Sequence, residues 1–385
     1  MYDNHVDVNK AILIVINFSR AVDFEEDVAE ALLLAESAGF TIVETVRLNR
    51  DKPDSGYFVG TGKLEEIRAV CNAVKPQVIL INHNILAVQE RNLDNYFSGI
   101  RIIDRTQLIL EIFASRVKSN EGILQVDLAQ QSYLATRLVR RWTHLERQRG
   151  GIGLRSGSGE KQIELDRRQI TDKVAKLKKR LDVVVKQRAT QRKQRDKNNF
   201  TSVSIVGYTN AGKSTLFNLL TKANVYAENR LFATVQTTSR KLFINDNCSI
   251  VLSDTVGFIR DLPTKLIAAF RATLEETVFA DLLLHVVDFS GVTKERQLAD
   301  VNLVLKEIHA NHVPQLIIYN KIDLCEEFAS KIDYSIDGEP IAVYLSAKLN
   351  LGIDLLRQAI EEKIVYLTMR NNSVKELVYE PWKDK

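Results

Sequence analysis

The sequence of 385 residues has few of the features that covalent cross-links, zinc sites or membrane anchoring require. Its three cysteines, Cys71, Cys248 and Cys325, are scattered and form no C-x-x-C spacing, so they indicate neither a disulfide framework nor a zinc site. No apolar run approaches the length that crosses a bilayer, and the first residues lack the basic-then-apolar pattern of a secretory signal. We therefore expect a soluble cytoplasmic protein with no membrane span.

The composition is that of a globular protein, with 45% apolar and 26% charged residues. The chain is longer than a domain with a single ordinary hydrophobic core. Two or three domains are therefore expected. The net charge of +4 is uneven, because residues 137–195 hold 19 Lys and Arg against six Asp and Glu, a balance of +13 that leaves −9 for the rest. Such asymmetry suggests that one region binds a polyanion.

Residues 207–214, G-Y-T-N-A-G-K-S, fit the pattern G-x-x-x-x-G-K-[ST] without a mismatch. A β-branched strand pattern precedes them at 201–206, and an apolar helix start follows at 215–220. Glycines allow positive φ and close backbone approach, so N–H groups can surround phosphate oxygens. The alternative is a chance glycine turn before a helix, which this order of elements disfavours. The residues expected to bind the nucleotide here are Gly207, Tyr208, Thr209, Asn210, Ala211, Gly212, Lys213, Ser214 and Thr215.

Three further elements follow, each after a strand pattern. The first is D-x-x-G at 254–257, where Asp254 can hold Mg²⁺ directly or through water and the Gly257 N–H can meet the γ-phosphate. The second is N-K-x-D at 320–323, where the Asp323 carboxylate can accept from two guanine N–H donors that adenine does not present as a pair. The third is S-A-K at 346–348. The expected contacts are Asp254, Thr255, Val256, Gly257, Asn320, Lys321, Asp323, Ser346, Ala347 and Lys348.

Four such elements in this order resemble the translation-factor-related GTPases. Residues 199–368 are therefore expected to form a P-loop GTPase domain with a doubly wound, mainly parallel sheet, followed by a short tail at 369–385. His285 lies within the apolar strand pattern 282–287, where a satisfied core residue is the expected role. His309 and His312 have the i, i+3 spacing of a metal pair, but exposed helix histidines are commoner than such sites and no third ligand is in view.

Residues 1–120 are expected to form an N-terminal α/β domain with a largely parallel sheet, because strand patterns at 11–16, 41–46, 77–81 and 100–103 alternate with helical spacing. Residues 58–63, F-V-G-T-G-K, open a helix and superficially suggest a second phosphate loop. They lack its spacing, so a structural turn is the favoured interpretation and a second nucleotide site the alternative.

Residues 121–198 are expected to form a long antiparallel helical hairpin. One apolar stripe begins at Leu124, and a second lies on a helix from about Glu160 to Arg195. A glycine-rich loop at 150–159 would form the tip. The opposite helix faces are densely basic, which favours nucleic-acid contact over a merely solvated face. Trp142 and His144 near the tip could stack on bases, although Trp142 also lies on the apolar stripe.

The chain resembles the HflX family of ribosome-associated GTPases over nearly its whole length. The resemblance lies in motifs that GTPases at large do not share, at 59–63, 89–93, 104–106, 135–140, 150–153 and 166–168. It implies binding to the large ribosomal subunit, contact of the hairpin tip with rRNA near the peptidyl-transferase centre, and separation of stalled ribosomes into subunits. A monomer that is partly associated with ribosomes or membranes is expected.

The family's switch I usually reads F-A-T-L-D-P-T-T-R, whereas residues 232–240 read F-A-T-V-Q-T-T-S-R. Thr234 matches the metal-binding threonine, with Thr237 and Thr238 as rivals. The expected nucleotide contacts are Phe232, Ala233, Thr234, Val235 and Gln236, the expected Mg²⁺ ligands are Ser214 and Thr234, and the expected catalytic residues are Lys213, Thr234, Asp254 and Gly257.

Phe258 stands where Ras-like proteins carry a water-orienting glutamine, and a phenyl ring cannot orient water by hydrogen bonding. Slow intrinsic turnover is therefore expected. An alternative function is an RNA-binding assembly scaffold that uses the nucleotide as a structural ligand, which the intact set of metal-binding residues disfavours.

Overall fold

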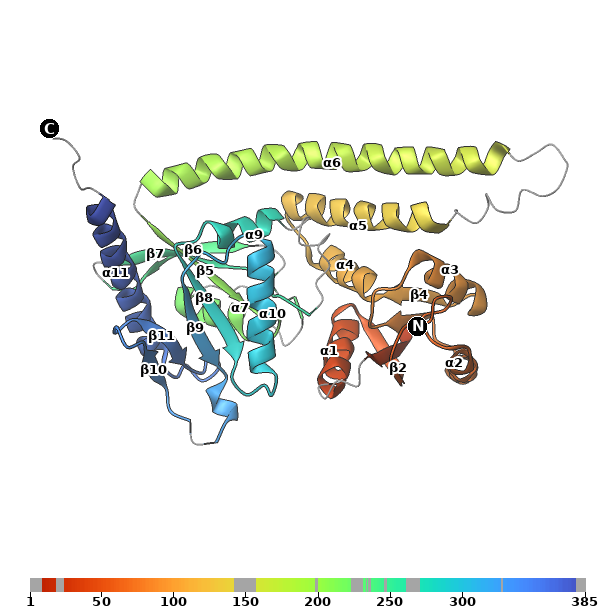
Figure 1. Ribbon diagram of the computed structural model, residues 1–385, viewed down its shortest axis with the longest axis horizontal. Helices are drawn as coiled ribbons and strands as arrows, with labels where there is room; N and C mark the ends of the chain where they lie inside the picture. The colour runs from red at the N-terminus through yellow and green to blue at the C-terminus, as the bar shows by residue number, and fades with distance from the viewer. Residues whose placement is uncertain are drawn as a thin grey trace, which may run out of the picture. The chain divides into compact units, whose positions relative to one another are not determined.

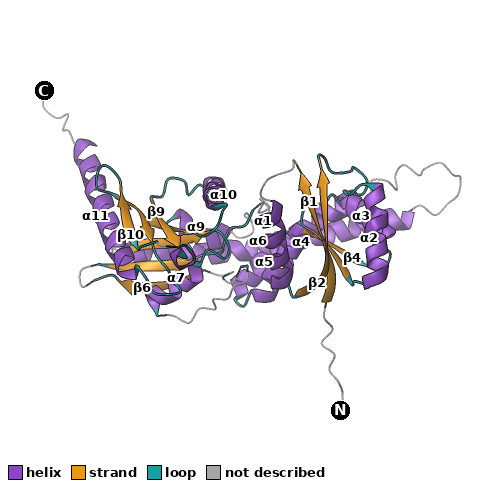
Figure 2. Cartoon of the chain, turned by 90° about the horizontal axis from the view of Figure 1, so that it is seen from below, coloured by secondary structure: helices purple, strands orange, loops and turns teal. Residues whose placement is uncertain are grey.

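The computed structural model of the protein describes residues 9–18, 24–141, 157–197, 200–222, 231–232, 234, 237–245, 248–260, 271–326 and 328–378. Within these residues the chain forms two compact units, one extending as far as Arg188 and the other beginning at Ala189. Each unit is built on its own β-sheet (Figures 1 and 2).

The first sheet has four parallel strands in the order β2-β1-β3-β4. They are β1 (Asn9–Phe18), β2 (Phe40–Arg50), β3 (Val78–Ile81) and β4 (Arg101–Asp104). Residues 11–17 of β1 are all buried, which is why its sequence is a continuous apolar run rather than an alternating one. The predicted N-terminal α/β domain with a parallel sheet is confirmed.

Four helices cover this sheet: α1 (Phe24–Ser37), α2 (Thr61–Val74), α3 (Ala87–Tyr96) and α4 (Arg105–Arg116). Alternate β1 side chains such as Ile12 and Ile14 join Leu64 of α2 and Leu93 of α3 in one core cluster. The G-T-G-K stretch is the start of α2. A Cβ at Gly60 would lie 2.2 Å from Nη1 of Arg50, so glycine permits the close approach of that side chain.

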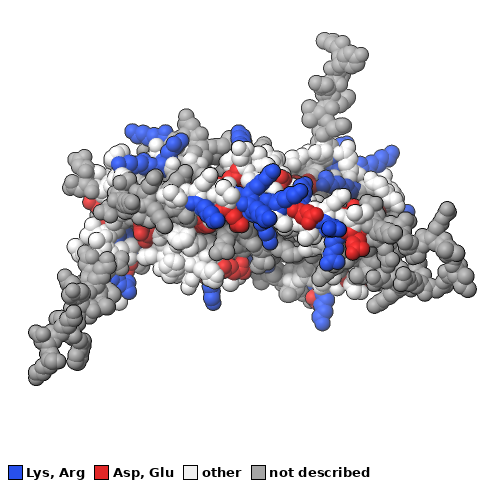
Figure 3. Space-filling view, turned by 90° about the horizontal axis from the view of Figure 1, so that it is seen from above, with Lys and Arg blue, Asp and Glu red and all other residues white. Residues whose placement is uncertain are grey.

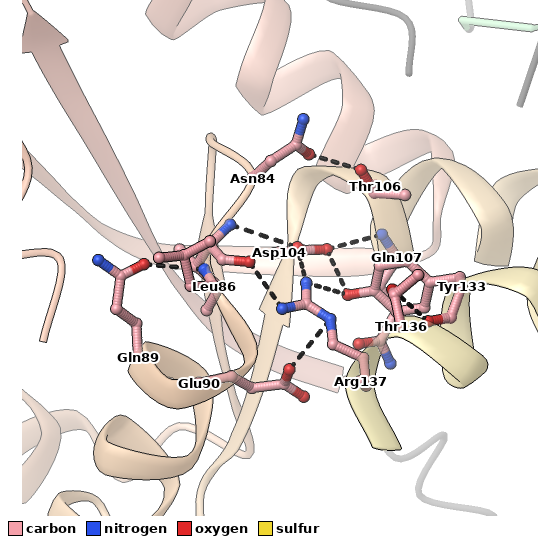
Figure 4. A network of polar contacts seen from close by, with 11 residues as sticks. Asn84, Leu86, Gln89, Glu90, Asp104, Thr106, Gln107, Tyr133, Thr136 and Arg137 are labelled. Atoms are coloured by element: carbon pink, nitrogen blue, oxygen red, sulfur yellow. Dashed lines mark hydrogen bonds and ion pairs between the residues drawn. The ribbon is translucent and has the colours of Figure 1, made fainter. Parts of the chain in front are cut away.

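Three of the N-terminal family motifs meet in one buried polar network (Figure 4). Its centre is Arg137, which forms an ion pair with Asp104 at the end of β4 and lies 3.2 Å from a Glu90 carboxylate oxygen through Nε. Arg137 also donates to the Ile85 carbonyl at 2.6 Å. Tyr133 donates to the second Asp104 oxygen at 2.9 Å, and burial together with that carboxylate raises the pKa of the tyrosine.

The network attaches the hairpin to the N-terminal sheet, because Tyr133 and Arg137 lie on α5 (Asn120–Arg141). Asp104 also caps α4, accepting from the Gln107 N–H at 2.9 Å. One carboxylate therefore connects a strand end, a helix start and the first hairpin helix. This explains why the hairpin and the N-terminal domain form one unit here, although the sequence suggested separate regions.

The second hairpin helix is α6 (Gly157–Lys197), which runs beside α5 in Figure 1. Leu124 and Leu128 of α5 pack against Val174, Leu177 and Leu181 of α6, as the two apolar stripes predicted. α6 begins at Gly157, inside the expected tip loop of 150–159. The rest of that loop, Trp142 and His144 lie outside the described residues.

The second unit contains a seven-stranded sheet in the order β10-β11-β9-β8-β5-β7-β6. Five strands are parallel, namely β5 (Thr201–Gly207), β7 (Ser249–Asp254), β8 (Leu282–Asp288), β9 (Gln315–Asn320) and β11 (Pro340–Tyr344). The antiparallel edge strands are β6 (Thr238–Phe243) and β10 (Lys331–Tyr334). The predicted mainly parallel sheet is confirmed.

Helices cover both faces of this sheet. The core on one face contains residues of α7 (Lys213–Thr221) and α11 (Ile353–Val378), for example Phe217 and Leu356. The other helices of this unit in the described residues are α9 (Arg271–Val278) and α10 (Lys294–Glu307). His285 of β8 is buried, contacts the Gln315 side chain at 3.1 Å through Nδ1, and has a pKa that burial lowers to about 4. It is the neutral core residue that the sequence suggested.

Candidate active site

The carboxyl ends of four parallel strands place the four sequence motifs along one edge of the second sheet. The glycine loop follows β5, Asp254 ends β7, Asn320 ends β9, and Ser346 comes two residues after β11. β5 lies between β7 and β8, so the chain crosses from one half of the sheet to the other beside the glycine loop. Ligands of open α/β sheets bind at such a switch point.

The loop glycines cannot be replaced without a clash. Gly207 has φ 146°, and a Cβ there would lie 2.2 Å from the Val286 carbonyl oxygen. Gly212 has φ 94° immediately before α7, and a Cβ there would lie 2.2 Å from the Asn320 amide nitrogen. Asn210 is also left-handed, with φ 63°. The backbone, rather than the side chains, shapes this loop.

Lys213 is the first residue of α7 and is almost fully buried. Its Nζ donates to the Tyr208 carbonyl at 2.7 Å, which holds the ammonium group over the loop. Burial lowers the pKa of Lys213 to about 8, and the neighbouring Asp254 carboxylate partly opposes that shift. A polyphosphate anion would favour the charged form of the lysine.

Three oxygen-bearing side chains from different segments meet next to the loop. The Ser214 hydroxyl lies 2.6 Å from that of Thr234 and donates to an Asp254 oxygen at 2.9 Å, and the Thr234 hydroxyl donates to the same oxygen at 2.8 Å. Burial raises the pKa of Asp254, and its Oδ1 has no partner among the described residues. Hard oxygen ligands around a buried carboxylate fit Mg²⁺.

This cluster contains Thr234 and neither of its rivals. Thr238 lies on β6 instead, and Thr237 lies just before that strand. Phe232, two residues before Thr234, is buried. Ala233, Val235 and Gln236 lie outside the described residues. For His309 and His312, the described part of the chain holds no group of three or more His, Cys, Asp or Glu that could bind a metal.

At the other end of the site, Asn320 connects two loops. Its amide donates to the Ala211 carbonyl at 2.9 Å and accepts from the Ala347 N–H at 2.9 Å. Lys321 has a positive φ of 66° and forms a 2.6 Å ion pair with Asp288 at the end of β8. The sequence interpretation missed Asp288, although its place after a buried strand was a signal.

Asp323 lies in a short 3-10 turn, Ile322–Leu324, and its Oδ1 is buried without a partner in the described chain. Ser346 is fully buried and accepts from the Leu349 N–H at 3.2 Å, which shapes the S-A-K loop. An unpartnered buried carboxylate oxygen costs free energy unless a ligand supplies a donor. The guanine edge has two such donors, so the geometry fits the ligand that the motif predicts.

The D-x-x-G segment is attached to the phosphate loop by two backbone hydrogen bonds. The Thr209 N–H donates to the Phe258 carbonyl at 2.6 Å, and the Phe258 N–H donates to the Gly207 carbonyl at 3.1 Å. Phe258 is only 2% exposed. Phe258 therefore packs inside the unit. This position agrees with the prediction that its side chain supplies no water-orienting group.

A phosphate loop and a carboxylate suited to guanine share one edge of a doubly wound sheet, so the second unit defines a P-loop GTPase. Family models agree along most of the chain. They match "GTP-binding GTPase N-terminal" at residues 25–114, "GTP-binding GTPase Middle Region" at 116–195 and "50S ribosome-binding GTPase" at 202–321.

The chain belongs to the HflX family of GTPases, which are GTP hydrolases. It is 48% identical to GTPase HflX of Escherichia coli (strain K12) over 364 residues, which cover 94% of this chain and 85% of that one. It is 46% identical to GTPase HflX of Magnetococcus marinus over 335 residues, covering 87% and 77% of the two chains. The solved structure of SsGBP with GDP is 25% identical, covers 93% of this chain and 99% of its own, and aligns with a TM-score of 0.51.

Proposed function

We propose that this GTPase binds the large ribosomal subunit through its basic hairpin and hydrolyses GTP there with Mg²⁺ held by Ser214, Thr234 and Asp254. The match of residues 202–321 to the model described as a 50S ribosome-binding GTPase supports this assignment. The proposal includes separation of stalled ribosomes into subunits, or a role in ribosome biogenesis or the stress response, which the family resemblance implies. No helix in the described residues is long and apolar enough to span a membrane.

The observation that carries the proposal is the outward surface of α6. Its apolar stripe packs on α5, which leaves the charged positions exposed. Between residues 164 and 187, eight exposed side chains are basic and three are acidic. The basic ones are Arg167, Arg168, Lys173, Lys176, Lys178, Lys179, Arg180 and Lys186. Lys and Arg side chains also gather in the middle of the face shown in Figure 3.

In the proposed reaction, different residues of the site bind the phosphates and orient the guanine. Loop N–H groups and Lys213 bind the phosphates, and Asn320, Lys321 and Asp323 orient the guanine. Mg²⁺, when bound, neutralises charge on the phosphate oxygens. Phosphoryl transfer requires mainly positioning and charge stabilisation, so such an arrangement supports slow turnover that a partner can accelerate.

The electrostatic part of the proposal is tested by replacing Lys178, Lys179 and Arg180 with Gln. We expect the variant to bind large subunits with a flatter salt dependence, because each lost phosphate contact reduces the slope by about 0.7–0.9. The measurement is pelleting of protein with large subunits across a series of salt concentrations.

The matched control removes three exposed cations elsewhere, Lys52, Arg240 and Lys306, also by change to Gln. Both variants lose the same net charge, so only a local contact distinguishes them. Equal slopes for the two variants, or a slope unchanged from wild type, would assign the α6 charges to solvent.

A further inference from the structure

The D-x-x-G segment lacks a side chain that can orient the attacking water, and a neighbouring residue can supply this function. In Ras-like enzymes that group is a glutamine, which orients the attacking water. Here the corresponding side chain, Phe258, is buried and apolar. The backbone of Phe258 is held next to the loop residue Thr209 by the 2.6 Å hydrogen bond from the Thr209 N–H. Thr209 is therefore the residue that lies next to the position where Ras-like enzymes carry the water-orienting glutamine.

The Thr209 side chain lies beside Gly257, and the Lys213 ammonium group lies beside the same glycine. A Cβ built on Gly257, whose N–H is expected to meet the γ-phosphate, would lie 2.8 Å from Cγ2 of Thr209 and 2.9 Å from Nζ of Lys213. Thr209 is 6% exposed. Its hydroxyl is carried by the same carbon as that methyl group, so it borders the same region.

The Thr209 hydroxyl is also buried and has no hydrogen-bond partner among the described residues. Leaving such a group unsatisfied costs about 1–3 kcal/mol, so a ligand is the expected partner. The other buried side-chain atoms of the described second unit that lack a partner are Asp254 Oδ1 and Asp323 Oδ1. Those two lie at the metal and guanine ends of the site, which leaves the γ-phosphate end to Thr209.

We propose that Thr209 is a catalytic residue whose hydroxyl orients the attacking water. A hydroxyl has one donor and two acceptor positions, so it can accept from the water and donate to a γ-phosphate oxygen at the same time. In Ras-like enzymes the glutamine has an amide oxygen to accept and an amide NH₂ to donate for the same two functions. The hydrogen bond from the Thr209 N–H to the Phe258 carbonyl holds the main chain of Thr209 in place before the substrate arrives, and preorganisation of this kind lowers a barrier.

The reaction that this hydroxyl assists is the hydrolysis of GTP. The water oxygen forms a bond to the γ-phosphorus while the bond from that phosphorus to the β–γ bridging oxygen breaks. The bridging oxygen remains on GDP, and the proton lost by the water is carried by inorganic phosphate. The inference depends on GTP hydrolysis by the isolated chain and not on the proposed ribosome contact, so it is tested without ribosomes.

The test compares Thr209→Val with Thr209→Ser in single-turnover hydrolysis by the full chain, with the protein in excess over GTP and with Mg²⁺ present. Valine keeps the branched shape and loses the hydroxyl, whereas serine keeps the hydroxyl. We expect the hydrolysis rate of the valine variant to fall by about 100-fold, the usual size of losing one transition-state contact. The serine variant should stay within about threefold of wild type, since its hydroxyl is retained.

Nucleotide affinity supplies a readout that does not depend on turnover. Titration of the valine variant should give an unchanged Kd for GDP and a Kd for a non-hydrolysable GTP analogue weakened about fivefold, because only the analogue has a γ-phosphate. Thr368→Val, which removes an exposed hydroxyl bonded to the Ile364 carbonyl, is the control and should change neither quantity. A valine variant with a wild-type rate would overturn the inference. A loss of GDP affinity as large as the loss of rate would also overturn it, because the hydroxyl would then act on loop structure.

Discussion

Asp323→Asn is expected to lower GTP affinity by at least about 100-fold and to shift preference towards xanthosine nucleotides. The carboxylate accepts from two guanine donors, and hydrogen bonds to a charged group contribute about 1.5–3 kcal/mol each. The asparagine amide turns one acceptor into a donor, which suits the second carbonyl of xanthine and opposes the amino group of guanine. The Asp323 Oδ1 is buried and has no partner among the described residues, so this exchange should act directly on guanine binding. Titrations with GTP and XTP measure the effect.

A matched control is Asp337→Asn, the same substitution at an exposed position of the second unit. It should leave both affinities unchanged. Retention of GTP affinity within a factor of about three in Asp323→Asn would show that guanine is selected elsewhere, because that change is well below the 1.4 kcal/mol that corresponds to tenfold.

Arg137→Met is expected to destabilise the first unit by about 3–5 kcal/mol, the usual cost of removing one partner from a buried ion pair. Methionine keeps much of the volume but leaves the carboxylates of Asp104 and Glu90 without the cation between them. The Asp104 side chain is 1% exposed, so water cannot replace the guanidinium. Denaturant unfolding should show a lower midpoint for the first unit, while GDP binding reports whether the second unit remains folded.

Arg47→Met provides the comparison, because Arg47 pairs with Glu25 on the surface, where the two side chains are 49% and 73% exposed. An exposed pair of this kind contributes about 0–1 kcal/mol. If Arg137→Met costs no more than Arg47→Met, the network shown in Figure 4 does not hold α5 on the N-terminal sheet.

The nucleotide site could be predicted from sequence because its motifs are local. Each one combines a buried strand with the loop directly after it, and parallel strands bring their carboxyl ends to one edge. The positions of Lys213, Asp254 and Asn320 follow from that rule. The hairpin stripes were equally readable, since residues such as Leu177 and Leu181 repeat at a helical interval.

Contacts between segments far apart in sequence could not be predicted in the same way. Arg137 belongs to a run of basic residues and was counted with them, yet it is buried among groups 33 and 52 residues away. No local pattern distinguishes it from an exposed arginine. β10 was also not expected, because its four residues form a strand only by pairing with β11 at the edge of the sheet. The Thr209 hydroxyl, which has no partner in the part of the chain that the structure describes, likewise becomes evident only once Gly257 and Phe258 are placed beside it.

The measurement that tests the central claim most directly is GTP turnover with and without purified large ribosomal subunits. The free protein should hydrolyse GTP slowly, and large subunits should raise the rate at least tenfold, which requires about 1.4 kcal/mol of additional transition-state stabilisation. Deletion of residues 156–158, from the loop predicted to form the hairpin tip, should remove that increase and leave the basal rate unchanged. A turnover that does not respond to large subunits, or an increase that survives the deletion, would contradict the proposed connection between rRNA contact and catalysis.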